Sequence, residues 1–214
     1  YNPKEKKGLN NTIGIQINKC NNIKIESCVF ENLFDGVSAS SCTFVELTSN
    51  TFTDGNIGYL DWGNNSLICS NTFTDINNGC LYALSLGSKN YNNTYTNNRI
   101  PIFNWGYSEH DIRNNTFDEY CSGVFSIGGK VNLGEVYKTY VCAYSYGKNI
   151  FKVDDDRNSN PYLPPYRTDV EAYPKDVVTI MFGQNEFSEY SDYHLAGDGS
   201  LSVMHNNFQP DSTV

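Results

Sequence analysis

Residues 50–54 read Asn-Thr-Phe-Thr-Asp, and the same five residues return at 71–75. Related forms follow as Asn-Thr-Tyr-Thr-Asn at 93–97 and Asn-Thr-Phe-Asp-Glu at 115–119. At seven positions an asparagine stands two residues before an aromatic: Asn50/Phe52, Asn71/Phe73, Asn93/Tyr95, Asn115/Phe117, Asn149/Phe151, Asn185/Phe187 and Asn206/Phe208. At an eighth position, Cys28/Phe30, the aromatic is kept and a cysteine replaces the asparagine. Most successive aromatics are 21 or 22 residues apart, and this spacing predicts a repeat architecture.

Each repeat is expected to consist of short strands and turns. Apolar residues precede the aromatics in alternating positions, such as Ile23 and Ile25 before Phe30. Residues two apart on a strand point to the same face, and the Gly- and Asn-rich stretches between the runs suit turns. One repeat is too short to bury a face alone, but stacked copies can share a core. We therefore expect stacked asparagines to hydrogen-bond along one column and stacked aromatics to fill the interior.

These motifs resemble the right-handed parallel β-helix proteins of the pectin-lyase-like superfamily, over roughly residues 12–151 and again over 178–208. The resemblance implies an all-β solenoid of about eight coils, forming a single domain over residues 1–214. That fold hosts polysaccharide lyases, glycosidases, phage tailspikes, adhesins and surface-layer proteins, so function must be argued from a site. The sequence lacks the paired Asp with Gly-His-Gly of polygalacturonases and the Arg-x-Pro-x-x-Arg of pectate lyases, which argues against an enzyme.

The repeat is interrupted twice, where the gap between aromatics grows to 34 and then 36 residues. We expect loop insertions at about 122–141 and 152–175, and such insertions often lie on a binding face. The first residues read as a polar lead into a coil already under way, and we see no capping helix at either end. The chain is therefore expected to be processed, part of a longer protein, or capped by neighbouring copies.

Composition narrows the partners and the compartment. The net charge of −9 argues against nucleic acid, because the chain has no basic stripe to neutralise phosphates. No apolar run reaches the roughly 18 residues that a membrane span needs. Four glycosylation sequons start at Asn10, Asn64, Asn92 and Asn114. Together with seven cysteines and the β-helix pattern, they favour an extracellular, cell-surface or virion-surface setting.

Two cysteines share a phase of the repeat. Cys20 and Cys42 each stand ten residues before an aromatic, so they are expected to be neighbours on adjacent coils. This makes the pair a disulfide candidate, since the spacing of coils is compatible with disulfide geometry. A column of buried thiols is the favoured alternative.

Acidic residues follow the aromatics at a fixed offset. Asp54, Asp75 and Glu119 each come two residues after an aromatic of the repeat. Carboxylates on adjacent coils repel unless a cation, a shared proton or solvent intervenes. Asp54 and Asp75 are therefore candidate ligands of Ca²⁺, and all three acids are candidates for the catalytic pair of glycoside hydrolysis. The favoured alternative is that these residues end a strand and form its turn.

Two tryptophans suggest a binding platform. Trp62 and Trp105 share a phase two coils apart, and each precedes a glycine. At a separation of roughly 10 Å, exposed rings could stack on sugars, and Tyr59, Tyr82 and Tyr107 could extend the surface. The alternative is that the rings brace turns or cover a subunit contact.

The function favoured by these patterns is an extracellular or surface-exposed structural and adhesive module of a surface, appendage or fibre protein. Its expected partners are a polysaccharide or glycan surface and further copies of itself, in a fibre or a trimer. Two alternatives stay open: a polysaccharide lyase or glycoside hydrolase, and a phage tailspike-like receptor-binding protein. No cofactor is expected except Ca²⁺ at the acidic column.

Overall fold

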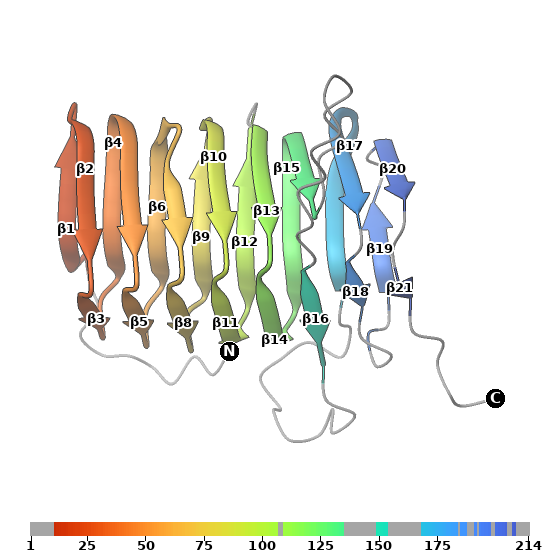
Figure 1. Ribbon diagram of the computed structural model, residues 1–214, viewed down its shortest axis with the longest axis horizontal. Helices are drawn as coiled ribbons and strands as arrows, with labels where there is room; N and C mark the ends of the chain where they lie inside the picture. Colours follow the sequence, from red (N-terminus) through yellow and green to blue (C-terminus); the bar gives the residue numbers. More distant parts are fainter. Residues whose placement is uncertain are drawn as a thin grey trace.

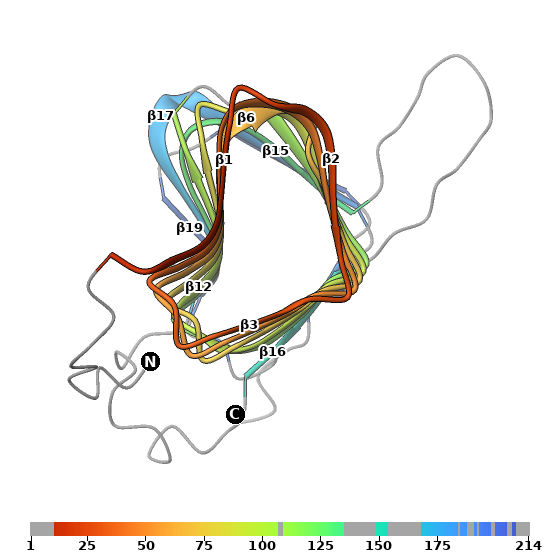
Figure 2. The same cartoon turned by 90° about the vertical axis from the view of Figure 1, so that its left-hand side faces the viewer.

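The computed structural model describes residues 11–106, 109–134, 149–153, 168–183, 185–187, 191, 193–197, 200–204 and 207–208. Within these ranges every regular element is a β-strand, and every strand pairing is parallel. The coils stack along the long axis of the molecule (Figure 1), and the end-on view shows a three-sided outline (Figure 2).

The strands form three faces, named here in chain order. Face 1 contains β1 (Ile13–Asn18), β6 (Ile57–Asn64), β9 (Asn78–Ala83), β12 (Ile100–Trp105) and β19 (Tyr193–Gly197). Face 2 contains β2 (Asn21–Glu26), β7 (Leu67–Cys69), β10 (Leu86–Tyr91), β13 (Glu109–Arg113) and β20 (Ser200–Met204). Three long strands run through the corner and belong to both faces: β4 (Asp35–Thr48), β15 (Ser122–Leu133) and β17 (Thr168–Gly183).

Face 3 is a separate sheet that carries the aromatic of each repeat. Its eight strands are β3 (Val29–Glu31), β5 (Thr51–Thr53), β8 (Thr72–Thr74), β11 (Thr94–Asn98), β14 (Thr116–Tyr120), β16 (Ile150–Lys152), β18 (Glu186–Phe187) and β21 (Asn207–Phe208). The expected all-β parallel solenoid is thereby confirmed. About six turns precede the second insertion, and face 3 has eight strands in all, one for each of the eight coils expected.

Parts of the two predicted insertions are regular strand. Residues 122–133 form the regular strand β15, which pairs along its whole length with β17. The extra residues of the first insertion therefore follow Gly134 instead of beginning at 122. Residues 168–175 likewise belong to β17. What remains of both insertions, 135–148 and 154–167, lies outside the described residues.

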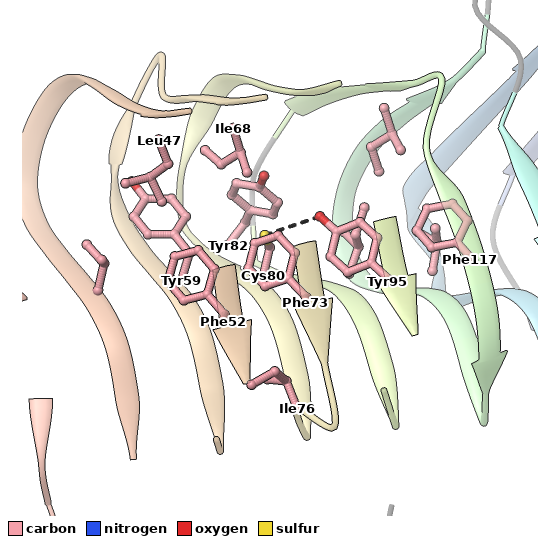
Figure 3. Close-up of a cluster of buried hydrophobic side chains, with 14 of the residues drawn as sticks. Leu47, Phe52, Tyr59, Ile68, Phe73, Ile76, Cys80, Tyr82, Tyr95 and Phe117 are labelled. Atoms are coloured by element: carbon pink, nitrogen blue, oxygen red, sulfur yellow. Dashed lines mark hydrogen bonds between the residues drawn. The ribbon is translucent and has the colours of Figure 1, made fainter. Parts of the chain in front are cut away.

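The predicted aromatic column fills the interior behind face 3 (Figure 3). Phe52, Phe73 and Tyr95 stack with centroid distances of 4.7 and 4.8 Å and interplanar angles of 4° and 7°. The stack continues in both directions, from Phe30 to Phe187. Because ring spacing equals coil spacing, each ring fixes the position of the next coil.

The predicted asparagine column is also confirmed, and it does more than join side chains. Asn71 donates its backbone N–H to Asn93 Oδ1 at 2.8 Å, and Asn93 does the same to Asn115 Oδ1. The side-chain amide of Asn93 donates to the carbonyl of Ile68 at 2.9 Å, at the end of a face 2 strand. Each asparagine thus satisfies buried backbone groups of the corner between faces 2 and 3, which would otherwise be costly.

Candidate functional site

Large apolar side chains are exposed together at the corner between faces 1 and 2, at the top of Figure 2. They are Phe44 (55 % exposed), Trp62 (42 %), Leu84 (56 %), Leu86 (52 %) and Trp105 (45 %). We call these five residues the apolar corner. Single exposed apolar residues are ordinary, but several gathered at one corner favour an interaction site.

The two tryptophans of the apolar corner touch each other. Trp105 pairs with Ala83 on the preceding coil. Trp62 lies one coil earlier still, opposite Ala83, because Asp61 before it pairs with Tyr82. The small side chain between them lets the rings meet edge to face, with centroids 5.8 Å apart and planes at 88°. The prediction of two separate rings roughly 10 Å apart is therefore wrong. They form one aromatic unit.

Two bulky residues of the apolar corner have a strained backbone. Phe44 has φ 59° and Leu84 has φ 56°, in the left-handed region that bulky residues rarely adopt. Asn65 and Gly87 take this conformation beside Phe44, and Gly106 takes it beside Leu84, at much lower cost. Each strained residue costs about 1 kcal/mol. Exposed apolar residues kept at a conformational cost favour a role in binding.

A surface groove of about 300 Å³ lies next to Phe44. Phe44 and Leu67 form its apolar walls, and Asn65, Glu46 and Lys89 supply an amide, a carboxylate and an ammonium group. Its size is at the lower end of the range for ligand pockets. An aromatic ring beside such groups can take both the apolar face and the hydroxyl groups of a sugar.

A buried polar cluster supports the apolar corner from inside. Asp61 is fully buried and accepts hydrogen bonds from the backbone N–H of Gly63 at 2.8 Å and from the hydroxyls of Ser85 and Ser88 at 3.0 and 3.1 Å. Burial raises the pKa of Asp61, and these hydrogen bonds oppose that rise. Since Asp61 directly precedes Trp62, its hydrogen bonds fix the strand that presents the tryptophan.

The remaining predicted platform residues are not available at the apolar corner. Tyr59 is fully buried, and its hydroxyl lies 3.0 Å from Ser66 Oγ inside the solenoid (Figure 3). The prediction that Tyr59 and Tyr82 extend an exposed surface is wrong, because both side chains point inward and are fully buried. Tyr107 lies outside the described residues.

The acidic column lies at a different corner, between faces 3 and 1. Asp54, Asp75, Asn97 and Glu119 all take φ between 53° and 60° directly after or within face 3 strands, as turn residues do. The amide of Asn97 donates to Asp75 Oδ1. Among the described residues, no three His, Cys, Asp or Glu side chains group as a metal site would require. The catalytic roles of Asp54, Asp75 and Glu119, and the Ca²⁺ site, stay predictions.

Cys20 and Cys42 are stacked neighbours but both are free thiols. The thiol of Cys20 donates to the carbonyl of Asn18 at 3.3 Å, and that of Cys42 to the carbonyl of Ser40 at 3.2 Å. Cys42 is buried and Cys20 is half-buried, and no disulfide joins the two thiols in the structure.

The sequon asparagines Asn64, Asn92 and Asn114 are all exposed, as a glycosylation acceptor must be. Asn10 lies outside the described residues. Glycosylation itself stays a prediction.

His110 gives the interior a measurable pH dependence. It is buried and stacks on Tyr82 with centroids 4.2 Å apart, and burial lowers its pKa to about 3. Between pH 6.5 and 3 the unfolded chain therefore binds a proton that the folded chain does not. As the pH is lowered below 6.5, the free energy of unfolding should decrease by about 1.4 kcal/mol per pH unit, which amounts to about 2 kcal/mol at pH 5.

The measurement is urea unfolding at pH 7.5 and pH 5.0 for the wild type and His110→Phe. The other histidines are present in both proteins and cancel in the difference. We expect the wild type to lose about 2 kcal/mol more than the variant on acidification. Equal losses would contradict a neutral, buried His110.

Comparison of the chain with protein-family models, with curated proteins and with solved structures gives no match. Among the described residues, no helix has the length and apolar character to cross a membrane.

Proposed function

We propose that this chain is a structural and adhesive β-solenoid module of an extracellular or surface-exposed protein, and that it binds glycan chains at the apolar corner. The observation that carries the proposal is the exposure of Phe44 and Leu84 in a strained backbone conformation. Folding alone would favour Asn or Gly there, so the retained apolar groups indicate a selected surface. Kinship with the pectin-lyase-like superfamily is part of this proposal and is supported by the repeating Asn-x-aromatic motif.

A glycan suits the apolar corner better than a purely apolar partner does. The Trp62–Trp105 unit offers ring faces and edges, and the groove beside Phe44 adds Asn65, Glu46 and Lys89. Sugars present C–H faces to aromatic rings and hydroxyls to such polar groups at the same time.

The test is binding to a panel of neutral and acidic polysaccharides, by affinity electrophoresis for soluble polymers and by pull-down for insoluble ones. The double variant Trp62→Ala, Trp105→Ala should bind at least about tenfold more weakly than the wild type, because the aromatic unit is lost. The matched control is Leu60→Ala, Phe103→Ala, which removes half-buried apolar groups from the same two strands two residues earlier.

A second variant separates binding from folding. Leu84→Asn removes one apolar side chain and relieves the left-handed strain, so it should raise the free energy of unfolding by about 1 kcal/mol while weakening binding. Light scattering on the same proteins reports self-association. Unchanged binding in both variants would refute the corner as a glycan site, and a dimer lost only in the tryptophan variant would assign it to self-association instead.

A further inference from the structure

Face 3 carries two parallel rows of threonine on its outer surface. The first row is Thr51, Thr72, Thr94 and Thr116, and the second is Thr53, Thr74 and Thr96. In β5, β8 and β11 a threonine stands on each side of an inward ring, in the order Thr-Phe-Thr or Thr-Tyr-Thr. We call this surface, along the lower edge of Figure 1, the threonine face.

The threonine face is in register and nearly untwisted. Thr51, Thr72 and Thr94 pair directly, as do Thr53, Thr74 and Thr96. The rings beneath them repeat every 4.7 to 4.8 Å and are tilted by only 4° to 8° from coil to coil. Most sheets twist by about 20° per strand, so the nearly parallel rings indicate that successive coils are rotated little here and that the threonine rows are close to flat.

Strand preference alone does not explain this composition. Threonine does favour strands, but valine, isoleucine and tyrosine favour them equally. The outward positions of the same coils on the other faces are mixed, for example Glu46 and Leu67 on face 2 and Leu60 and Phe103 on face 1. Uniform threonine is confined to face 3 within the described coils.

The hydroxyls of the threonine face are free to bind an external partner. None of the seven donates or accepts a side-chain hydrogen bond among the described residues. No charged side chain interrupts the two rows. Glu31 pairs with Thr53 at one end, and Asp118 and Lys152 lie beyond Thr96 at the other. Asp54 and Asp75 border the second row at the corner toward face 1. The chain carries a net charge of −9, yet this lattice of hydroxyls and methyls is uncharged.

We propose that the threonine face binds ice. Its hydroxyls repeat at about 4.8 Å along the rod and about 6.7 Å between the two rows, spacings comparable to the oxygen rows on growing ice surfaces. The methyl groups order the water between them, and each hydroxyl can replace one water of the lattice. A flat, rigid and uncharged array is needed for many weak contacts to form together.

The test measures the uptake of wild-type protein into slowly growing ice and the gap between its melting and freezing temperatures. Both measurements are made on the isolated protein before and after enzymatic removal of any N-glycan, because the sequon residues Asn92 and Asn114 border the threonine face. We expect the wild type to enter the ice and to depress freezing below melting. Thr72→Lys, Thr94→Lys places two ammonium groups in the middle of the lattice and should lose both properties.

The matched control is Thr48→Lys, an outward threonine of β4 on face 2, which should keep both properties. If circular dichroism shows that the lysine variant is misfolded, Thr72→Ser, Thr94→Ser keeps the hydroxyls, removes the methyls and should still reduce uptake. Exclusion of the wild type from ice, or equal uptake by the wild type and the face variants, overturns the proposal.

A second outcome would also overturn the ice proposal: the wild type does not enter ice but binds microcrystalline chitin or cellulose, and the Thr72→Lys, Thr94→Lys change abolishes that binding. The threonine face would then be assigned to a flat polymer. The tryptophan variant of the apolar corner should enter ice like the wild type. The two proposals can therefore fail separately.

Discussion

Replacing Asn93 by alanine should lower the free energy of unfolding by about 4 kcal/mol, because four buried groups each lose a hydrogen bond at once. Asn93 Oδ1 accepts the backbone N–H of Asn71 at 2.8 Å and its side-chain amide at 3.1 Å. Asn93 Nδ2 donates to the carbonyl of Ile68 at 2.9 Å and to Asn90 Oδ1 at 2.9 Å. All of these contacts are buried, so water cannot replace them.

Urea unfolding followed by circular dichroism measures this effect. Asn78→Ala is the control, since Asn78 lies in the same part of the rod and its side chain makes no hydrogen bond among the described residues. The control should change stability by no more than about 0.5 kcal/mol. Similar losses in both variants would mean that the asparagine column does not hold the coils together.

The column architecture could be predicted because each coil repeats the same physical problem. An asparagine must satisfy the backbone at the corner before face 3, and an aromatic must fill the core behind it. Both residues contact mainly the equivalent positions of adjacent coils, so the periodicity of the sequence alone locates Asn93 and Tyr95. The start of the first insertion, after Gly134, was harder to predict, because the strand β15 before it carries no Asn-x-aromatic motif to mark its place in the repeat.

The apolar corner was only partly predictable. Trp62 and Trp105 were found by their shared phase, but their contact depends on the small Ala83 between them. Phe44 and Leu84 were missed because nothing in their local sequence marks a left-handed turn. Tyr59 was placed on the surface with Trp62, although residues three apart on a strand point to opposite sides. Strand parity was the signal that could have excluded it.

A glycine column beside the aromatic stack was also missed. Gly36, Gly58, Gly79 and Gly123 each come six residues after an aromatic of the repeat. A Cβ at these positions would meet the carbonyl oxygen of the next coil at 2.5 to 2.7 Å. The signal was present in the sequence as a second 22-residue periodicity, and it explains why the coils can approach so closely at this point.

Replacing Gly58 by alanine should therefore destabilise the protein by about 3 kcal/mol. The new Cβ would lie 2.6 Å from the carbonyl oxygen of Gly79 and 2.6 Å from the Phe73 ring. Phe73 cannot easily move, because it is stacked between Phe52 and Tyr95 at 4.7 and 4.8 Å. Thermal and urea unfolding of Gly58→Ala would measure the cost.

The chain itself indicates how such crowding is relieved. Pro101 occupies the glycine column one coil after Gly79, and the ring beside it, Phe117, departs from the regular stack. Its centroid lies 5.3 Å from Tyr95, and its plane is tilted by 17° to Tyr95 and 27° to Phe151. Alanine at 58 should force a similar tilt on Phe73, inside the most regular part of the stack.

Gly128→Ala is the matched comparison, because the two glycines are needed for different reasons. Gly128 has φ +69°, but a Cβ there would meet its nearest neighbour only at 3.7 Å. Its replacement should cost about 1 kcal/mol through backbone conformation alone. Gly58 has no positive φ, so its cost arises from crowding alone. A Gly58→Ala protein as stable as Gly128→Ala would show that the stack yields to a methyl group, and that coil spacing is not set by contact between glycine and ring.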